Sequence, residues 1–277
     1  MLTTILGGIL LLVVLTVIHE LGHLLVARAF GVGVERFAVG FGPGFKMFTV
    51  KGIPFYFRYI LLGGFVVLKT RDLEKTESEG KYLEDVARWK KILILLGGVG
   101  FNLAVAAVLR TLMFWFAPAN TETKILAMTF HFARVSEWYL APFYAIFLTL
   151  KMFAVYFINM MVGIWFLVLP IVRMQPIEGG GMAGMIGLGA NAHAGFWSYC
   201  GLLYIVSVLL AALNLLPLMP FDGGHIATTL VQKVFGDRRV SRILCGIITY
   251  LGFAILLMLL VNMLMSDTYA GIKFFGK

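Results

Sequence analysis

The residues most suited to chemistry form the run His19-Glu20-Leu21-Gly22-His23, which has the H-E-x-x-H pattern. On an α-helix His19 and His23 are four residues apart and share one face, where two neutral imidazoles can bind the same Zn²⁺ ion. Glu20 adjoins the first histidine, so its carboxylate can take a proton from a water molecule that the metal activates. The pattern therefore predicts metal-assisted hydrolysis of an amide bond.

The setting of this motif is unusual, because it lies in an apolar run over residues 2–30 where a membrane-spanning helix is expected. Five residues with three fixed positions also match by chance, and a polar contact between helices is the alternative interpretation. A glutamate at the centre of a membrane helix costs about 2.5–3.5 kcal/mol on insertion scales. That cost favours a functional role for Glu20 and its neighbours.

Zinc needs a third protein ligand, and the candidates are His131, His193, His225 and Asp222. Asp222 is the best placed, because Pro217 and Pro220 interrupt the helix before it and free backbone polar groups. Irregular backbone at membrane depth is tolerated where it lines a cavity or is buried in protein. Taken alone, Asp222 is equally explained by an Asp-Gly turn after a membrane span.

The composition excludes an ordinary soluble protein, since 60% of the 277 residues are hydrophobic and 13% are charged. The net charge of +9 does not indicate nucleic-acid binding, because the basic residues are unevenly spread. Twelve of the 23 Lys and Arg residues lie in 28–91, and only four lie in 117–195. This asymmetry is typical of cytoplasmic loops in a membrane protein.

The fold class that we expect is an all-α polytopic membrane protein, with one intramembrane domain over residues 1–277. Four segments are long and apolar enough to span, at about 2–30, 92–117, 197–219 and 243–265. The basic loops 31–91 and 220–242 are then cytoplasmic. Both termini are external, and His19 and Asp222 end near the cytoplasmic side of the cell (inner) membrane.

One further segment, 143–169, is 27 residues long with a single charge at Lys151. A lone extra span there would move Asp222 to the opposite side from His19. We therefore expect an interfacial or re-entrant helix. A sixth span over 176–195 would also restore parity, but its Gly-rich sequence makes a poor spanning helix.

Residues 34–70 differ from the rest, with short β-branched and aromatic runs separated by Gly and Pro. This pattern predicts a small β-loop on the cytoplasmic side of the membrane. An exposed β-edge there, in a stretch such as Leu62–Leu68, can pair with an unwound substrate strand. A hairpin that only seals the cytoplasmic mouth is an equally good interpretation. Residues 71–91 are charged and predict a helix on the membrane surface.

These motifs together resemble the site-2 protease family of intramembrane zinc metalloproteases. The likeness rests on His19–His23 and the segment 214–224, and on 34–43 and 62–65 for its bacterial regulator-of-sigma-E-protease-like branch. It covers most of the chain in the same order. The resemblance implies a zinc ion held by His19, His23 and Asp222, with Glu20 as the base. It also implies substrate binding by Asn214 and Pro217, to which the β-edge interpretation adds Gly63 and Gly64.

Two features depart from that family. Met219 stands where a second proline is usual, with Pro220 following it, and residues 118–195 leave no room for the PDZ domains of this branch. The expected activity is endoproteolysis within transmembrane segments of membrane-anchored proteins in the lipid bilayer. The alternatives are a non-catalytic metal-binding or chaperone-like membrane protein and a zinc transporter. A transporter would place ligands along a path, whereas this chain concentrates them. The sequence predicts neither the substrate nor the oligomeric state.

Overall fold

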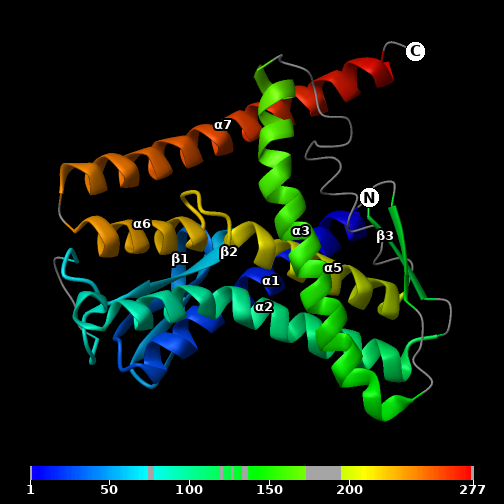
Figure 1. The fold of residues 1–277 in the computed structure, drawn as a ribbon. Helices are drawn as coiled ribbons and strands as arrows, with labels where there is room; N and C mark the ends of the chain where they lie inside the picture. Colours follow the sequence, from blue (N-terminus) through cyan, green and yellow to red (C-terminus); the bar gives the residue numbers. More distant parts are fainter. Residues whose placement is uncertain are drawn as a thin grey trace. The chain divides into compact units, whose positions relative to one another are not determined.

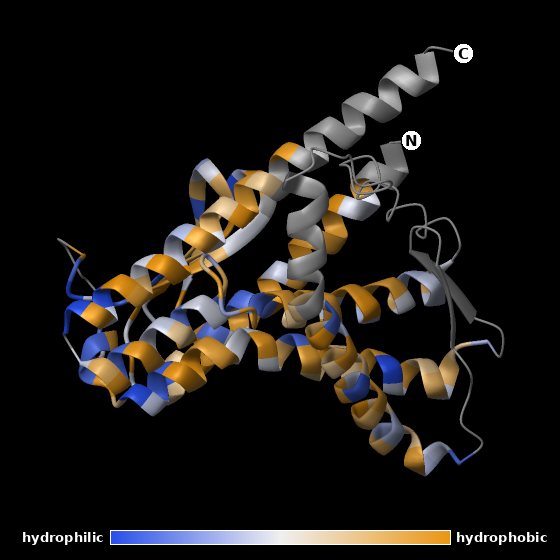
Figure 2. Cartoon of the chain, turned by 45° about the horizontal axis from the view of Figure 1, so that its top comes forward, coloured by the Kyte–Doolittle hydropathy of each residue, from blue (hydrophilic) through white to orange (hydrophobic). Residues whose placement is uncertain are grey.

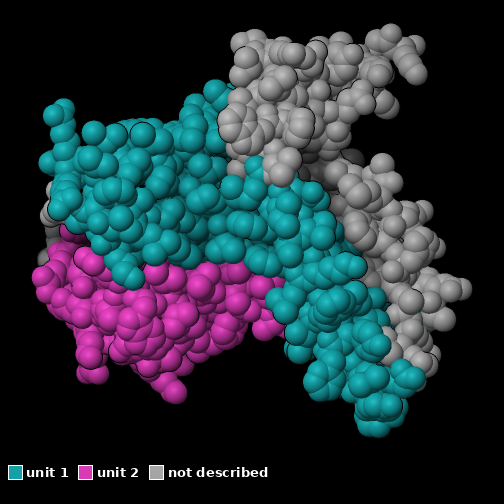
Figure 3. Space-filling model, in the orientation of Figure 1, with its two compact units in different colours: residues 1–8, 106–277 teal, residues 9–105 magenta. Residues whose placement is uncertain are grey.

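The computed structural model describes residues 2–73, 78–118, 121–125, 128–132, 137–172, 195–236 and 238–275. The chain divides into two compact units, Ile9–Val105 and the combination of Met1–Gly8 with Ala106–Lys277 (Figure 3). A single domain over 1–277 stays a prediction.

The unit Ile9–Val105 contains most of α1 (Leu2–Ala29), then β1 (Val34–Val50), β2 (Ile53–Leu68), the 3₁₀ turn η1 (Leu83–Asp85) and the first part of α2 (Arg88–Phe116) (Figure 1). α1 is one continuous helix of 28 residues through the H-E-x-x-H motif. A turn at Gly31, where φ is +75°, ends α1 and leads into β1.

β1 and β2 form the predicted β-loop and pair antiparallel. Phe37, Ala38 and Val39 of β1 have partners in both halves of β2, at Val66, Phe65 and Gly64 and at Phe55, Tyr56 and Phe57. β1 therefore lies between the two halves of β2. The second half of β2 has one hydrogen-bonding edge of its backbone against β1 and the other edge directed away from β1.

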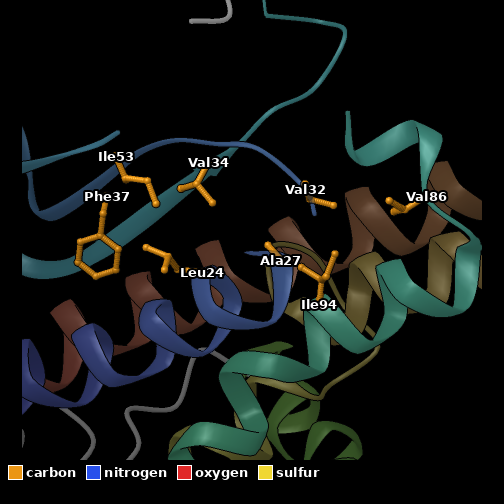
Figure 4. Close-up of a cluster of buried hydrophobic side chains, with 8 residues drawn as sticks. All are labelled: Leu24, Ala27, Val32, Val34, Phe37, Ile53, Val86 and Ile94. Atoms are coloured by element: carbon orange, nitrogen blue, oxygen red, sulfur yellow. The ribbon is translucent and has the colours of Figure 1, made fainter. Parts of the chain in front are cut away.

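A buried apolar cluster holds α1, the β-loop and α2 together (Figure 4). α1 contributes Leu24 and Ala27, and α2 contributes Ile94. The β-loop side and the segment before α2 contribute Val32, Val34, Phe37, Ile53 and Val86. Burying a Leu, Ile, Val or Phe side chain is worth about 1.5–3 kcal/mol. The cluster thus fixes the strands against the helix that carries the histidines.

Among its described residues, the second unit contains the hairpin of β3 (Thr121–Ile125) and β4 (Met128–Phe132) and the turn η2 (Trp138–Leu140). It also contains the helices α3 (Ala141–Val172), α5 (Phe196–Asn214), α6 (Asp222–Phe235) and α7 (Arg239–Phe275). α3 and β3 contact α5, and α6 contacts α7. Tyr204 of α5 donates a hydrogen bond to Sδ of Met152 on α3.

All four segments predicted as membrane spans are helices, and hydrophobic residues run along them (Figure 2). Among the described residues, five helical segments are long and apolar enough to cross a membrane, and the fifth is Trp138–Met161. The predicted count of four spans is therefore not confirmed. The apolar composition of 143–169 gives a long helix whether or not it crosses. The alternative span over 176–195 lies almost wholly outside the described residues.

One local prediction is wrong, and two elements of the structure were not predicted. The described part of 71–91 contains η1 and the start of α2, not a separate surface helix. Backbone bonds explain this, because Lys81 and Leu83 donate to Gly31 and Lys69 and so tie the segment to the ends of β1 and β2. The hairpin β3–β4 and the helix α6 were not predicted from sequence.

Candidate active site

His19 and His23 lie on one face of α1, and their Nε2 atoms are 3.1 Å apart. Both side chains are buried, and their rings meet at 83° with centroids 4.7 Å apart. Two nitrogens bound to a tetrahedral zinc at about 2.0–2.1 Å are separated by about 3.3 Å. The spacing of the two Nε2 atoms therefore fits a shared zinc ion.

The other ring nitrogen of each histidine contacts α2. Nδ1 of His23 is 2.8 Å from the backbone oxygen of Ile94, and Nδ1 of His19 is 3.3 Å from Nδ2 of the Asn102 amide. Metal-binding histidines commonly use their second nitrogen in this way, which fixes the ring orientation.

Gly98 of α2 gives the two rings their space. A Cβ atom at this position would lie 2.5 Å from Cε1 of His19 and 2.5 Å from Nε2 of His23. Beside it, at Gly97, the backbones of α1 and α2 approach so closely that a Cβ on Gly22 would lie 2.3 Å from the oxygen of Gly97. The close contacts therefore require glycine at Gly22, Gly97 and Gly98.

Glu20 is half-buried and faces β2, where the backbone N–H of Val66 donates a 2.9 Å hydrogen bond to its Oε2. A Cβ on Gly64 would lie 3.8 Å from Cγ of Glu20, so the strand passes directly beside the carboxylate. Gly63 is buried with φ at +152° and lies against Phe41. The structure thus brings Gly64, but not Gly63, next to the predicted base.

The remaining predicted site residues belong to the other unit. Asn214 is the last residue of α5, Pro217 is exposed in the segment between α5 and α6, and Asp222 is the first residue of α6. An acidic side chain in the first turn of a helix is favoured by the helix dipole. Of the other candidate ligands, His131 lies on β4, His225 is exposed on α6 and His193 lies outside the described residues.

Close backbone packing shapes the segment 215–221. A Cβ on Gly223 would lie 2.2 Å from the oxygen of Leu215, and one on Gly224 would lie 2.6 Å from the carbonyl carbon of Leu218. On α7, a Cβ on Gly252 would lie 2.2 Å from the oxygen of Met219. The peptide bond between Met219 and Pro220 is cis. Three glycines therefore allow this irregular segment to fold against the start of α6 and against α7.

Sequence reasoning missed the groups around the motif, which are Ile94, Gly98, Asn102 and Val66. The paired glycines Gly97 and Gly98 in an apolar helix were a usable signal, because small residues permit close helix approach in membranes. The backbone oxygen of Ile94 and the backbone N–H of Val66 carry no such signal, since any residue supplies them.

Comparison with known proteins decides the family. The profile described as Peptidase family M50 matches residues 7–259. The chain belongs to this family. Family M50 is the site-2 protease family, so the resemblance seen in the sequence is confirmed, and with its apolar helices the chain is a multi-pass membrane protein.

Three relatives illustrate the similarity. Proteins named "Putative zinc metalloprotease" from Helicobacter pylori J99 and Borreliella burgdorferi are 36% identical over 125 residues and 42% identical over 107 residues. These matches cover 43% and 36% of this chain and 34% and 25% of those proteins. "Zinc metalloprotease Rip1" of Mycobacterium bovis BCG is 35% identical over 103 residues, which are 33% of this chain and 24% of that protein. The matched part is about a third or less of each curated relative.

Proposed function

We propose that this M50 chain is a zinc-dependent intramembrane endopeptidase, which hydrolyses peptide bonds in transmembrane segments of membrane-anchored proteins. The observation that carries the proposal is the arrangement on α1. Two buried Nε2 atoms 3.1 Å apart can share a zinc ion, and the Glu20 carboxylate that follows the first of them is held by a strand. A polar contact between helices would not require a carboxylate held beside a β-edge.

The third zinc ligand in this proposal is Asp222. It supplies a carboxylate oxygen, which is an ordinary zinc ligand. It also follows the irregular segment 215–221, whose backbone is packed on Gly223, Gly224 and Gly252. His225, three residues later, is exposed on α6 and is the weaker candidate. Two histidines and one carboxylate match the ligand set of catalytic zinc sites with an open fourth position.

Zinc supplies a Lewis acid that polarises the scissile carbonyl and makes water acidic enough to lose a proton near neutral pH. The chain's own residues do the rest. Glu20 accepts that proton on its carboxylate and delivers it to the leaving amine. The N–H of Val66 fixes the carboxylate through Oε2, so the base does not need to reorganise when the proton arrives.

Substrate binding follows from the position of β2. A transmembrane helix hides its amides in internal hydrogen bonds, so cleavage needs an extended segment. The edge of β2 at Gly63 and Gly64 can pair with such a segment next to Glu20, as in strand addition. We assign the other side of the substrate strand to Asn214 and Pro217.

The orientation in this proposal follows the distribution of basic residues. Segments 31–91 and 220–242 face the cytoplasm, both termini are external and the site lies near the cytoplasmic side of the cell (inner) membrane. Four segments cross, and α3 lies in the outer interface or re-enters. This arrangement keeps His19 and Asp222 on the same side.

The decisive experiment replaces Glu20 by Gln and measures zinc content and cleavage of a membrane-anchored reporter in the same preparation. We expect one zinc per chain in both proteins and loss of cleavage only in Glu20→Gln. A zinc transporter or a metal-binding membrane protein would keep its zinc and never cleave the reporter. Cleavage that survives in the variant would exclude Glu20 as the base.

A further inference from the structure

The Nδ1 atom of His19 lies 3.3 Å from Nδ2 of the side-chain amide of Asn102, which is fully buried on α2. The two residues are 83 positions apart in the chain, and both belong to the unit Ile9–Val105. No part of the proposed reaction uses Asn102 as a ligand, a base or a substrate contact. Its place beside the first histidine therefore needs another explanation.

Proton positions on the imidazoles decide whether the two histidines can bind a metal. The oxygen of Ile94, 2.8 Å from Nδ1 of His23, can only accept a hydrogen bond, so Nδ1 of His23 carries the proton. Nε2 of His23 then keeps its lone pair for a metal. His19 must carry its proton on the same nitrogen, because its Nε2 points at the same position.

Asn102 can produce either outcome at His19. The structure has the amide with Nδ2 toward Nδ1 of His19, an orientation that donates to the ring and leaves its proton on Nε2, where it blocks metal binding. A 180° rotation of the same amide presents Oδ1, which accepts from Nδ1–H and leaves Nε2 bare. The rotation changes neither the shape nor the volume of the side chain.

We propose that Asn102 is a positioning residue, which accepts a hydrogen bond from Nδ1–H of His19 and so selects the tautomer whose Nε2 binds zinc. This inference rests on the proposed zinc site. α2 then supplies an acceptor for each histidine, a backbone oxygen at Ile94 for His23 and a side-chain oxygen at Asn102 for His19. A residue that merely filled space beside the ring would be replaceable by an apolar side chain of the same size.

The test compares Asn102→Leu, which has similar volume and no acceptor, with Asn102→Asp, which keeps an acceptor of the same shape. Zinc affinity is measured by competition with a chelator in detergent. Loss of such an outer partner typically weakens metal binding 10–100-fold. We expect that loss in Asn102→Leu and wild-type or tighter binding in Asn102→Asp. Thr111→Val, which removes a hydroxyl from the same helix about two and a half turns away, should bind zinc like the wild type.

A second readout separates hydrogen bonding from packing. In zinc-loaded protein with ¹⁵N-labelled histidine, the Nδ1–H proton of His19 should move downfield from Asn102→Leu to wild type to Asn102→Asp. Replacing His131, His193 and His225 by Gln leaves only the signals of His19 and His23 of the 5 histidines, and only that of His19 should respond to the Asn102 variants. A purely structural role would leave the proton shift unchanged.

The outcomes distinguish the two proposals. A wild-type protein that binds no zinc would remove the proposed function and this inference together. A wild type that binds zinc, with Asn102→Leu within twofold of it and the same proton shift, would overturn only the role of Asn102. Equal weakening of zinc binding in Asn102→Leu and Asn102→Asp would also overturn only the role of Asn102. Because Asn102→Asp keeps the shape of the side chain, its zinc affinity can be interpreted even if Asn102→Leu folds poorly.

Discussion

The backbone N–H of Val66 donates a 2.9 Å hydrogen bond to Oε2 of Glu20, so strand β2 holds the carboxylate that helix α1 carries. Because this N–H points at α1, it takes no part in the ladder between β2 and β1. A backbone group on an edge strand thereby becomes part of the catalytic arrangement.

Val66→Pro removes that donor without removing a ladder bond. A hydrogen bond to a charged group contributes about 1.5–3 kcal/mol, so reporter cleavage should fall roughly tenfold to hundredfold. Zinc content should not change, because the lost hydrogen bond is to Glu20, which is not a proposed zinc ligand. Val66→Ala keeps the N–H and should cleave at nearly the wild-type rate. Equal rates for the two variants would mean that the Val66 hydrogen bond does not support the base.

Gly98→Ala tests the space that α2 leaves for the two imidazoles. Its Cβ would lie 2.5 Å from ring atoms of His19 and His23, so zinc binding and cleavage should both be lost. Gly100→Ala is the matched control, because a Cβ there meets nothing within 4 Å. Alanine favours a helix over glycine by about 1 kcal/mol, so Gly100→Ala should be neutral or slightly stabilised in thermal unfolding. Full zinc occupancy in Gly98→Ala would contradict the packing described here.

Asp222→Ala should lower the zinc content of the purified protein and abolish cleavage, because the site would keep only two protein ligands. His225→Ala alters the competing candidate on the same helix and should leave both quantities unchanged. Elemental analysis of the two variants beside the wild type gives the answer. If instead His225→Ala loses zinc and Asp222→Ala keeps it, the ligand assignment is reversed.

Gly252→Ala, a substitution on α7, tests whether the packing of the segment 215–221 positions Asp222. A Cβ on Gly252 would lie 2.2 Å from the oxygen of Met219, so the segment must move, and both zinc affinity and cleavage should fall. Gly246→Ala on the same helix meets only ring atoms of Tyr250 at 3.8 Å or more and should behave as wild type. Cleavage assays and chelator competition measure both effects. Similar zinc affinities and cleavage rates in Gly252→Ala and Gly246→Ala would show that the segment does not position Asp222.

Gly64→Pro tests pairing of the substrate with the edge of β2. By strand alternation the N–H of Gly64 points away from β1, as that of Val66 does. Gly64→Ala is the control. It adds a Cβ 2.8 Å from the oxygen of Ala38, as Gly64→Pro does, but it keeps the backbone N–H. Slower cleavage in Gly64→Pro than in Gly64→Ala, at equal zinc content, is the expected result. Identical rates would favour a β-loop that only covers the site.

The sequence was sufficient to predict the long apolar helices, the β-loop and two histidines on one face of α1. Each of these has a local signature, in the form of an apolar run, an alternation broken by Gly and Pro, or a four-residue spacing. The contacts that orient the pair have none. Asn102 and Ile94 reach the histidines only because α2 crosses α1 at glycines, which is a tertiary event.

α3 shows a second limit of prediction from the sequence. Its composition satisfies every local rule for a spanning helix, so apolar length alone cannot decide whether it crosses. The helix α6 was overlooked for a different reason. It is short and amphipathic, and it begins directly after the irregular segment 215–221, where the two prolines indicated a loop.

The backbones of α1 and α2 come together at Gly22 and Gly97, and each glycine adjoins a residue of the histidine site. On either side of this crossing α2 also contacts the imidazoles, through the backbone oxygen of Ile94 and the side chain of Asn102. Contacts at three levels of one helix resist its rotation about the other. α1 and α2 therefore form a rigid frame, in which the two imidazoles keep their orientation while other parts of the chain move.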